Sequence, residues 1–232
     1  MLGDFILALP ILVFSLVAHE YAHAVVAYHQ GDDTAYLLGR ITLNPLPHLD
    51  PFLSILMPAL TWFISSQAFG YPFVFGGAKP VPVDPRKYRN YVRGDLLVSS
   101  AGVITNFVLS FVFALLFMVI GLVGRGTGGS SVLEAIQRMC MYGMWLNLFL
   151  CFFNLIPVPP LDGSHVLYHL LPRAWAERYR SLHNFGLLPI FALIFLFRPV
   201  FRVLLTPAFF MMNLQVHLVL PFAIGNGWNI FT

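Results

Sequence analysis

The chain alternates between long apolar segments and short polar connections. A helix needs about 20 apolar residues to cross the hydrocarbon layer of a bilayer, and most of the segments approach or exceed that length. The pattern predicts an all-α polytopic membrane protein with five to six hydrophobic segments and no separate soluble domain. The apolar segments cover residues 5–30, 52–70, 96–124, 134–158, 184–200 and 203–224.

Segment 52–70 differs from the others because prolines interrupt it. Pro51 and Pro72 flank the segment, and Pro58 lies inside it. Proline removes a backbone donor and disturbs a continuous helix. We therefore predict a re-entrant hairpin or half-helix that enters and leaves the membrane on one side, with a complete span as the alternative.

The composition agrees with a membrane protein. Hydrophobic residues make up 58% of the chain and charged residues only 10%, whereas soluble domains carry about 25% charged residues. Basic residues gather in the connections 71–95 and 163–183, and the positive-inside rule places both in the cytoplasm. The net charge of +3 therefore reflects membrane topology, and we expect no nucleic-acid partner.

Three ionisable side chains interrupt the first apolar segment. His19, Glu20 and His23 form the pattern HExxH within the stretch SLVAHEYAHAVVAYH. Positions i and i+4 of a helix lie on one face, so the two imidazoles can bind one zinc ion. A glutamate beside the first ligand can take a proton from a water molecule that zinc activates. Because ionisable groups in a membrane segment are costly, a purely structural polar cluster is the weaker interpretation.

A hydrolytic zinc site usually has three protein ligands and one water molecule. Asp162, in the stretch FFNLIPVPPLDGSHVL, is the acidic residue that residue counts place at the membrane depth of His19. The prolines before it end a helix and leave extended backbone, from which a short side chain can turn toward the first helix. We expect Asp162 to be the third ligand, with an ordinary aspartate after a proline-terminated helix as the alternative. His165 is expected to be a solvated side chain at the membrane interface, with support of the metal ligands from nearby as the alternative.

The order of these motifs resembles that of the site-2 protease family of intramembrane zinc metalloproteases. The HExxH pattern lies in the first helix, and a later NxxPxxxLDG motif runs from Asn154 to Gly163. The resemblance covers residues 5–170 and is similar to a compact bacterial-type branch without a PDZ-like or nucleotide-binding domain. Three further stretches carry it: GRITLNPLPHLDPF, FGGAKPVPVDPRKYRN and SAGVITNFVLS.

The resemblance implies a single peptidase domain over residues 1–232, with a three-helix catalytic core inside 5–170 and accessory C-terminal membrane helices in 184–224. One zinc ion per chain would be the cofactor.

The resemblance also implies roles for individual residues. His19, His23 and Asp162 would bind the metal, and Glu20 would be the general base. Asn154 would contact the substrate backbone or the developing oxyanion. A hydrogen bond between helices is the alternative role for Asn154.

A helical transmembrane substrate hides its peptide bonds, and the family exposes them by pairing the substrate with an edge strand. The matching stretch here is YPFVFGGAKPV, which predicts a small β-like element on the cytoplasmic side. Phe75, Gly76, Gly77 and Ala78 are the expected substrate contacts, because the glycines allow close backbone approach. A plain loop is the alternative.

These features together predict a protease that cuts a single-span membrane-protein substrate in or near its transmembrane segment. The lipid bilayer would be the inner membrane of a bacterial cell, with the active site toward the cytoplasm. A zinc transporter or metal sensor is the second hypothesis, although the polar groups gather at one level rather than along a path. A catalytically silent relative is the third, but such relatives usually lose the base or a ligand, and here all four residues are present.

Overall fold

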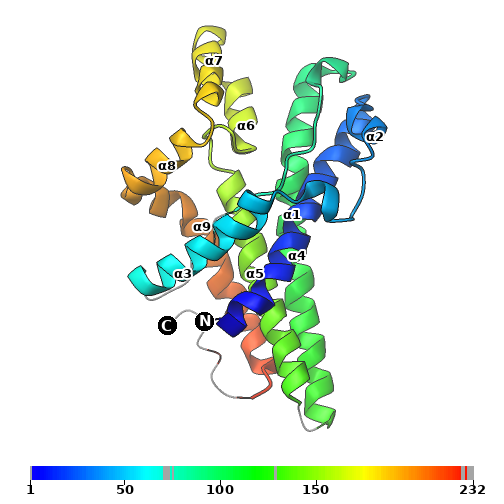
Figure 1. The fold of residues 1–232 in the computed structure, drawn as a ribbon, viewed down its shortest axis with the longest axis vertical. Coiled ribbons are helices and arrows are strands. Elements are labelled where there is room, and N and C mark those ends of the chain that lie inside the picture. The colour runs from blue at the N-terminus through cyan, green and yellow to red at the C-terminus, as the bar shows by residue number, and fades with distance from the viewer. Residues whose placement is uncertain (1, 70–73, 75, 128–129, 226–227, 229–232) are drawn as a thin grey trace.

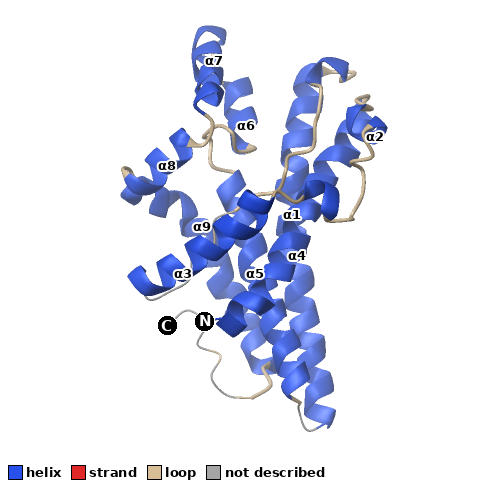
Figure 2. Cartoon of the chain, viewed as in Figure 1, coloured by secondary structure: helices blue, strands red, loops and turns tan. Residues whose placement is uncertain are grey.

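The computed structural model describes residues 2–69, 74, 76–127, 130–225 and 228 of the chain. Four long helices form the main bundle, and shorter helices lie around it (Figure 1). No β-strand occurs among these residues, which confirms the predicted all-α class (Figure 2). The long helices are α1 (Leu2–Gln30), α4 (Tyr91–Thr127), α5 (Ser131–Asn154) and α9 (Arg198–Val219). The short ones are α2 (Thr34–Leu37), α3 (Met57–Phe69), α6 (Gly163–Leu170), α7 (Arg173–Arg180) and α8 (Leu188–Phe195).

Helices α1, α4 and α5 pack against one another, and α9 covers α5 from the other side. The seam between α4 and α5 contains the fully buried side chains of Phe117 and Met144. Small residues permit this close packing, as is common between helices in membranes. A Cβ atom added to Gly143 of α5 would lie 2.4 Å from the ring of Phe113 of α4. The three-helix arrangement carries the site residues described below.

The protein is an integral membrane protein, but fewer helices meet the requirements for a span than the sequence suggested. Helix α5 falls short because Gln137, Asn147 and Asn154 are among the polar residues that lower its hydropathy. The predicted count of five to six membrane segments is therefore not confirmed. Within the described residues, three helices are long and apolar enough to cross a bilayer by length and composition: Leu2–Gln30, Tyr91–Gly126 and Arg198–Phe222.

The apolar segment 184–200 does not form one continuous helix. It contains the end of a 3-10 turn, the eight-residue helix α8 and the start of α9. Gly186 has a φ of 56°, in the left-handed region that favours glycine, and interrupts the helical conformation before α8. A helix of eight residues is about 12 Å long, less than half the thickness of the hydrocarbon layer.

The start of segment 52–70 is hydrogen-bonded to residues that follow the segment. It begins as a π-helical turn, Pro51–Leu56, and continues as α3. On the return, the Gly77 amide donates to the Leu53 carbonyl at 3.0 Å, and the Lys79 amide donates to the His48 carbonyl at 2.7 Å. The start of the segment therefore lies beside residues 77–79, and its re-entry into the membrane stays a prediction.

Candidate metal centre and active site

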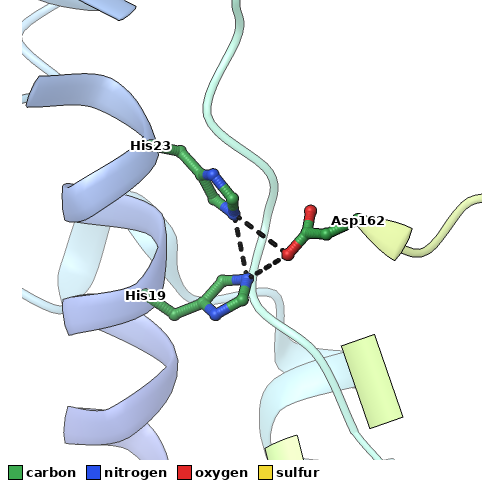
Figure 3. Close-up of side chains that lie close together, drawn as sticks. All are labelled: His19, His23 and Asp162. Carbon is green, nitrogen blue, oxygen red and sulfur yellow. Dashed lines mark hydrogen bonds and ion pairs between the residues drawn. The ribbon is translucent and has the colours of Figure 1, made fainter. Parts of the chain in front are cut away.

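His19 and His23 lie one turn apart on α1 and point toward the same place (Figure 3). Their side chains are largely buried, with exposed fractions of 8% and 12%. The two Nε2 atoms are 3.0 Å apart, and the ring planes are nearly perpendicular at 83°. This is the convergence that the HExxH spacing predicts for one helical face.

Asp162 approaches the two histidines from a different part of the chain. Helix α5 ends at Asn154, and the backbone turns repeatedly before α6 begins directly after Asp162. The Oδ2 atom of Asp162 lies 3.2 Å from His19 Nε2 and 3.4 Å from His23 Nε2 (Figure 3). Gly163 makes this turn feasible, because a Cβ there would lie 2.2 Å from the Leu155 carbonyl oxygen.

The three ligand atoms fit a tetrahedral zinc site. Zinc bonds of 2.0–2.1 Å to nitrogen and slightly longer ones to oxygen place neighbouring atoms of a tetrahedron about 3.3–3.5 Å apart. The observed separations of 3.0, 3.2 and 3.4 Å lie within a few tenths of an ångström of that value. Among the described residues no other group of three His, Cys, Asp or Glu side chains converges in this way. Two imidazoles and one carboxylate leave a fourth position for water, as in catalytic zinc sites.

Helix α4 forms the wall behind the two histidines. The Nδ1 atom of His23 lies 2.6 Å from the Val98 carbonyl oxygen, so Nδ1–H donates there and Nε2 is left to face the site. Gly102 provides space for the other ring, because a Cβ at this position would lie 2.5 Å from His19 Cε1. Sequence reasoning missed both contacts, and the glycine in the stretch SAGVITN was the available signal.

A second polar cluster connects α6 to α4. Asp95, a buried residue near the start of α4, accepts from His165 Nδ1 at 3.1 Å and from His169 Nε2 at 2.7 Å. The hydrogen bond to Asp95 raises the pKa of the His165 imidazole above its usual value. The His165 side chain is 38% exposed, so it is partly solvated as well as paired with Asp95. Because His165 lies three residues after Asp162, the cluster fixes the first turn of α6 and the position of Asp162 with it.

Glu20 and Asn154 both contact backbone groups. The Oε2 atom of Glu20 accepts a hydrogen bond from the Val81 amide at 2.7 Å. Asn154 donates from Nδ2 to the Leu150 carbonyl of its own helix at 2.9 Å. Within the described residues Asn154 makes no hydrogen bond to another helix.

Of the residues expected to contact substrate, Gly76, Gly77 and Ala78 lie outside any helix or strand. Phe75 lies outside the described residues. Gly76 is packed so closely that a Cβ there would lie 2.5 Å from Pro58 Cγ, whereas a Cβ on Gly77 would meet nothing within 4 Å. The close neighbours of Gly76 belong to the chain itself and the side of Gly77 is open, so contact with a substrate stays a prediction. Ala78 is half-buried beside them.

Comparison with known proteins agrees with this chemistry. The pattern of Peptidase family M50 matches residues 118–197, a range that includes Asp162. A Bacillus subtilis protein named "Putative zinc metalloprotease YwhC" is 36% identical over 188 residues, which are 79% of this chain and 77% of that protein. A Mycolicibacterium smegmatis protein named "Putative zinc metalloprotease Rip2" is 32% identical over 171 residues, 73% of this chain and 60% of that protein. No solved structure matches the chain.

The identity to the Bacillus subtilis protein extends over more than three quarters of both chains. The relatives carry names that specify zinc, and the convergent histidines and aspartate form a site that suits this metal. The chain therefore belongs to Peptidase family M50, the site-2 protease family of zinc metalloproteases, and its cofactor is zinc.

Proposed function

We propose that the protein is an intramembrane endopeptidase that hydrolyses a peptide bond in or beside the transmembrane segment of a single-span membrane protein. One observation carries the proposal: His19, His23 and Asp162 converge inside a bundle whose α1 and α4 are apolar and long enough to cross a bilayer. A zinc ion held by these three residues lowers the pKa of a bound water to about 7. Peptide hydrolysis at membrane depth is the chemistry that this combination favours.

In this proposal Glu20 is the general base and then the general acid. It accepts the proton that the attacking water loses and delivers it to the leaving amine. Asn154 assists at the carbonyl oxygen of the substrate. Its amide nitrogen has two hydrogens, of which one is used by the Leu150 carbonyl. The second remains to donate to the substrate backbone or to the developing oxyanion.

The substrate pairs with the extended segment 76–78. Within this segment, Gly77 forms hydrogen bonds to the turn Pro51–Leu56. Its amide donates to the Leu53 carbonyl, and its carbonyl accepts from Ser54 Oγ at 2.7 Å. The amide of Ala78 has no partner among the described residues. One edge of the segment is therefore used internally and the other can accept an extended peptide.

Replacing Ala78 with proline tests this pairing. The variant removes a free N–H without breaking an internal hydrogen bond, and we expect cleavage efficiency to fall at least about tenfold while zinc content stays unchanged. An Ala78→Ser control retains the N–H and should cleave like the wild type. Unchanged cleavage by Ala78→Pro would exclude pairing at this edge.

We place the protein in the inner membrane of a bacterial cell, with the active site toward the cytoplasm. The basic connections 71–95 and 163–183 support this orientation. Asp162 lies at the start of the second connection, and the Glu20 partner Val81 lies in the first. The bacterial sources of two relatives support the choice of membrane.

The proposal is tested by cleavage of a model single-span peptide by the purified protein in lipid vesicles. We expect cleavage within or next to the span, complete loss of cleavage after treatment with a zinc chelator, and recovery when zinc is returned. Zinc-loaded protein that never cleaves would favour a silent relative, and zinc uptake into the vesicles would favour a transporter.

A further inference from the structure

We infer that the backbone amide of Val81 positions the general base and couples it to the segment that binds substrate. The inference rests on the role proposed for Glu20. It concerns a single hydrogen bond between two parts of the chain, from Val81 N–H to Glu20 Oε2 at 2.7 Å across 61 residues of sequence. Hydrogen bonds to ionised carboxylates are short and strong compared with neutral ones.

The contact makes the two oxygens of the Glu20 carboxylate different from each other. Oε2 accepts from Val81, whereas Oε1 accepts no hydrogen bond within the described part of the chain. One oxygen is therefore held in place and the other remains available for a water molecule. A general base must keep an acceptor within about 2.6–3.2 Å of the proton that it removes, so a fixed carboxylate is an advantage.

The residues on either side of Val81 have no backbone N–H, so the Val81 amide is the backbone hydrogen-bond donor at this place. Val81 lies between Pro80 and Pro82 in the stretch KPVPVD, and proline has no N–H. Of these three consecutive residues, Val81 alone can donate from the backbone. A following proline also restricts Val81 to extended conformations. The alternating prolines therefore present one donor in a backbone of limited freedom.

The side chain of Val81 fixes the same residue against α1. It is 7% exposed and belongs to a buried cluster with Ala24 and Ala35. Ala24 follows Glu20 by one helical turn, so the amide and the side chain of Val81 contact neighbouring turns of α1. Lys79, two residues earlier, is held by its carbonyl, which accepts from Arg40 at 2.9 Å.

The free edge at Ala78 lies only three residues before Val81. In extended backbone this separation is about 10 Å. The proposed substrate edge and the donor to the base therefore belong to one short piece of restrained chain. A substrate that aligns this segment also aligns the Glu20 carboxylate, which links binding to proton transfer.

Three variants separate the amide from the side chain. Val81→Pro removes the N–H, Val81→Ala retains it but loses packing, and Val83→Pro makes the same change at an exposed valine with no described amide partner. We expect Val81→Pro to lower kcat about 10- to 100-fold, part of the 10²–10⁴-fold that a general base contributes. KM and zinc content should change little, and Val83→Pro should retain most of the wild-type kcat. Val81→Ala should lose less kcat than Val81→Pro, because it keeps the N–H.

A double-variant comparison tests whether Val81 acts through Glu20. If it does, adding Val81→Pro to Glu20→Gln should cause no further loss of the residual cleavage. A merely structural role would lower the residual rate of the Glu20→Gln protein as well. Additive losses would therefore overturn the inference.

Amide hydrogen exchange provides a readout that needs neither zinc nor cleavage. With exchange resolved to single residues, we expect the Val81 amide to exchange at least about fivefold faster in Glu20→Ala than in the wild type. The Lys79 amide, which donates to the His48 carbonyl, should be unchanged and serves as the internal control. Equal exchange at Val81 in both proteins would overturn the inference even if the protein proves to be a protease. Faster exchange without any wild-type cleavage would instead retain the contact and reject the proposed function.

Discussion

Replacing Glu20 with glutamine is expected to reduce peptide cleavage by about 10²–10⁴-fold, the contribution of a general acid–base group, while zinc stays bound. Glutamine retains an oxygen that can accept from the Val81 amide, so the local structure should persist. What the variant loses is the ability to take up and release a proton. The measurement is the single-turnover rate on the model single-span peptide, together with zinc content.

Glu177→Gln is the matched control. Glu177 lies on α7, and its side chain is 69% exposed. The Glu177→Gln substitution makes the same chemical change away from the metal centre. Its rate should equal that of the wild type. A Glu20→Gln protein that cleaves at the wild-type rate would remove Glu20 from the mechanism and leave zinc chemistry without an assigned base.

Removing any one of the three convergent side chains should abolish cleavage and strip the metal. We expect about one zinc ion per wild-type chain, and little zinc on His23→Ala or Asp162→Ala after equal dialysis. Loss of a group outside the ligand shell weakens metal binding by about 10- to 100-fold, and loss of a direct ligand should exceed that range. Zinc content by elemental analysis and affinity by chelator competition provide the measurement.

His29→Ala and Asp33→Ala are suitable controls, because His29 is exposed, the Asp33 side chain is 50% exposed, and neither belongs to the convergent group. Both should retain zinc and activity. If Asp162→Ala kept a full complement of tightly bound zinc, the third ligand would lie elsewhere, and the significance of the LDG motif would have to be reconsidered.

The convergence of His19, His23 and Asp162 could be predicted from the sequence, because these residue types are typical metal ligands. HExxH specifies two imidazoles on one helical face, and the prolines before Asp162 predict a turn at the level of His19. The structure brings these side chains to within 3.4 Å of one another. The helical class followed from apolar length, whereas the hairpin at segment 52–70 stays a prediction.

The supporting contacts were not accessible in this way. The Val98 carbonyl and the Val81 amide are backbone groups, which every residue type offers, so no sequence pattern marks them. Gly102 and Asp95 matter because of the register between α4 and its neighbours. That register depends on packing between residues far apart in the chain. Hydropathy also does not register where Gly186 interrupts a helix, so the break within segment 184–200 was not predicted.

Under the proposed function, the length of α4 bears on where a substrate would have to unfold. The helix has 37 residues and is about 55 Å long, whereas the hydrocarbon layer is about 30 Å thick. Its charge-free stretch begins at Leu96, and Gly102, which contacts His19, lies only about 9 Å farther along. A peptide bond cut at this level would lie near the boundary of the bilayer. There the carbonyl and amide groups freed by unwinding can be hydrated, whereas at the midplane each would cost several kcal/mol. The proposed protease would therefore need to uncoil only the end of a transmembrane helix.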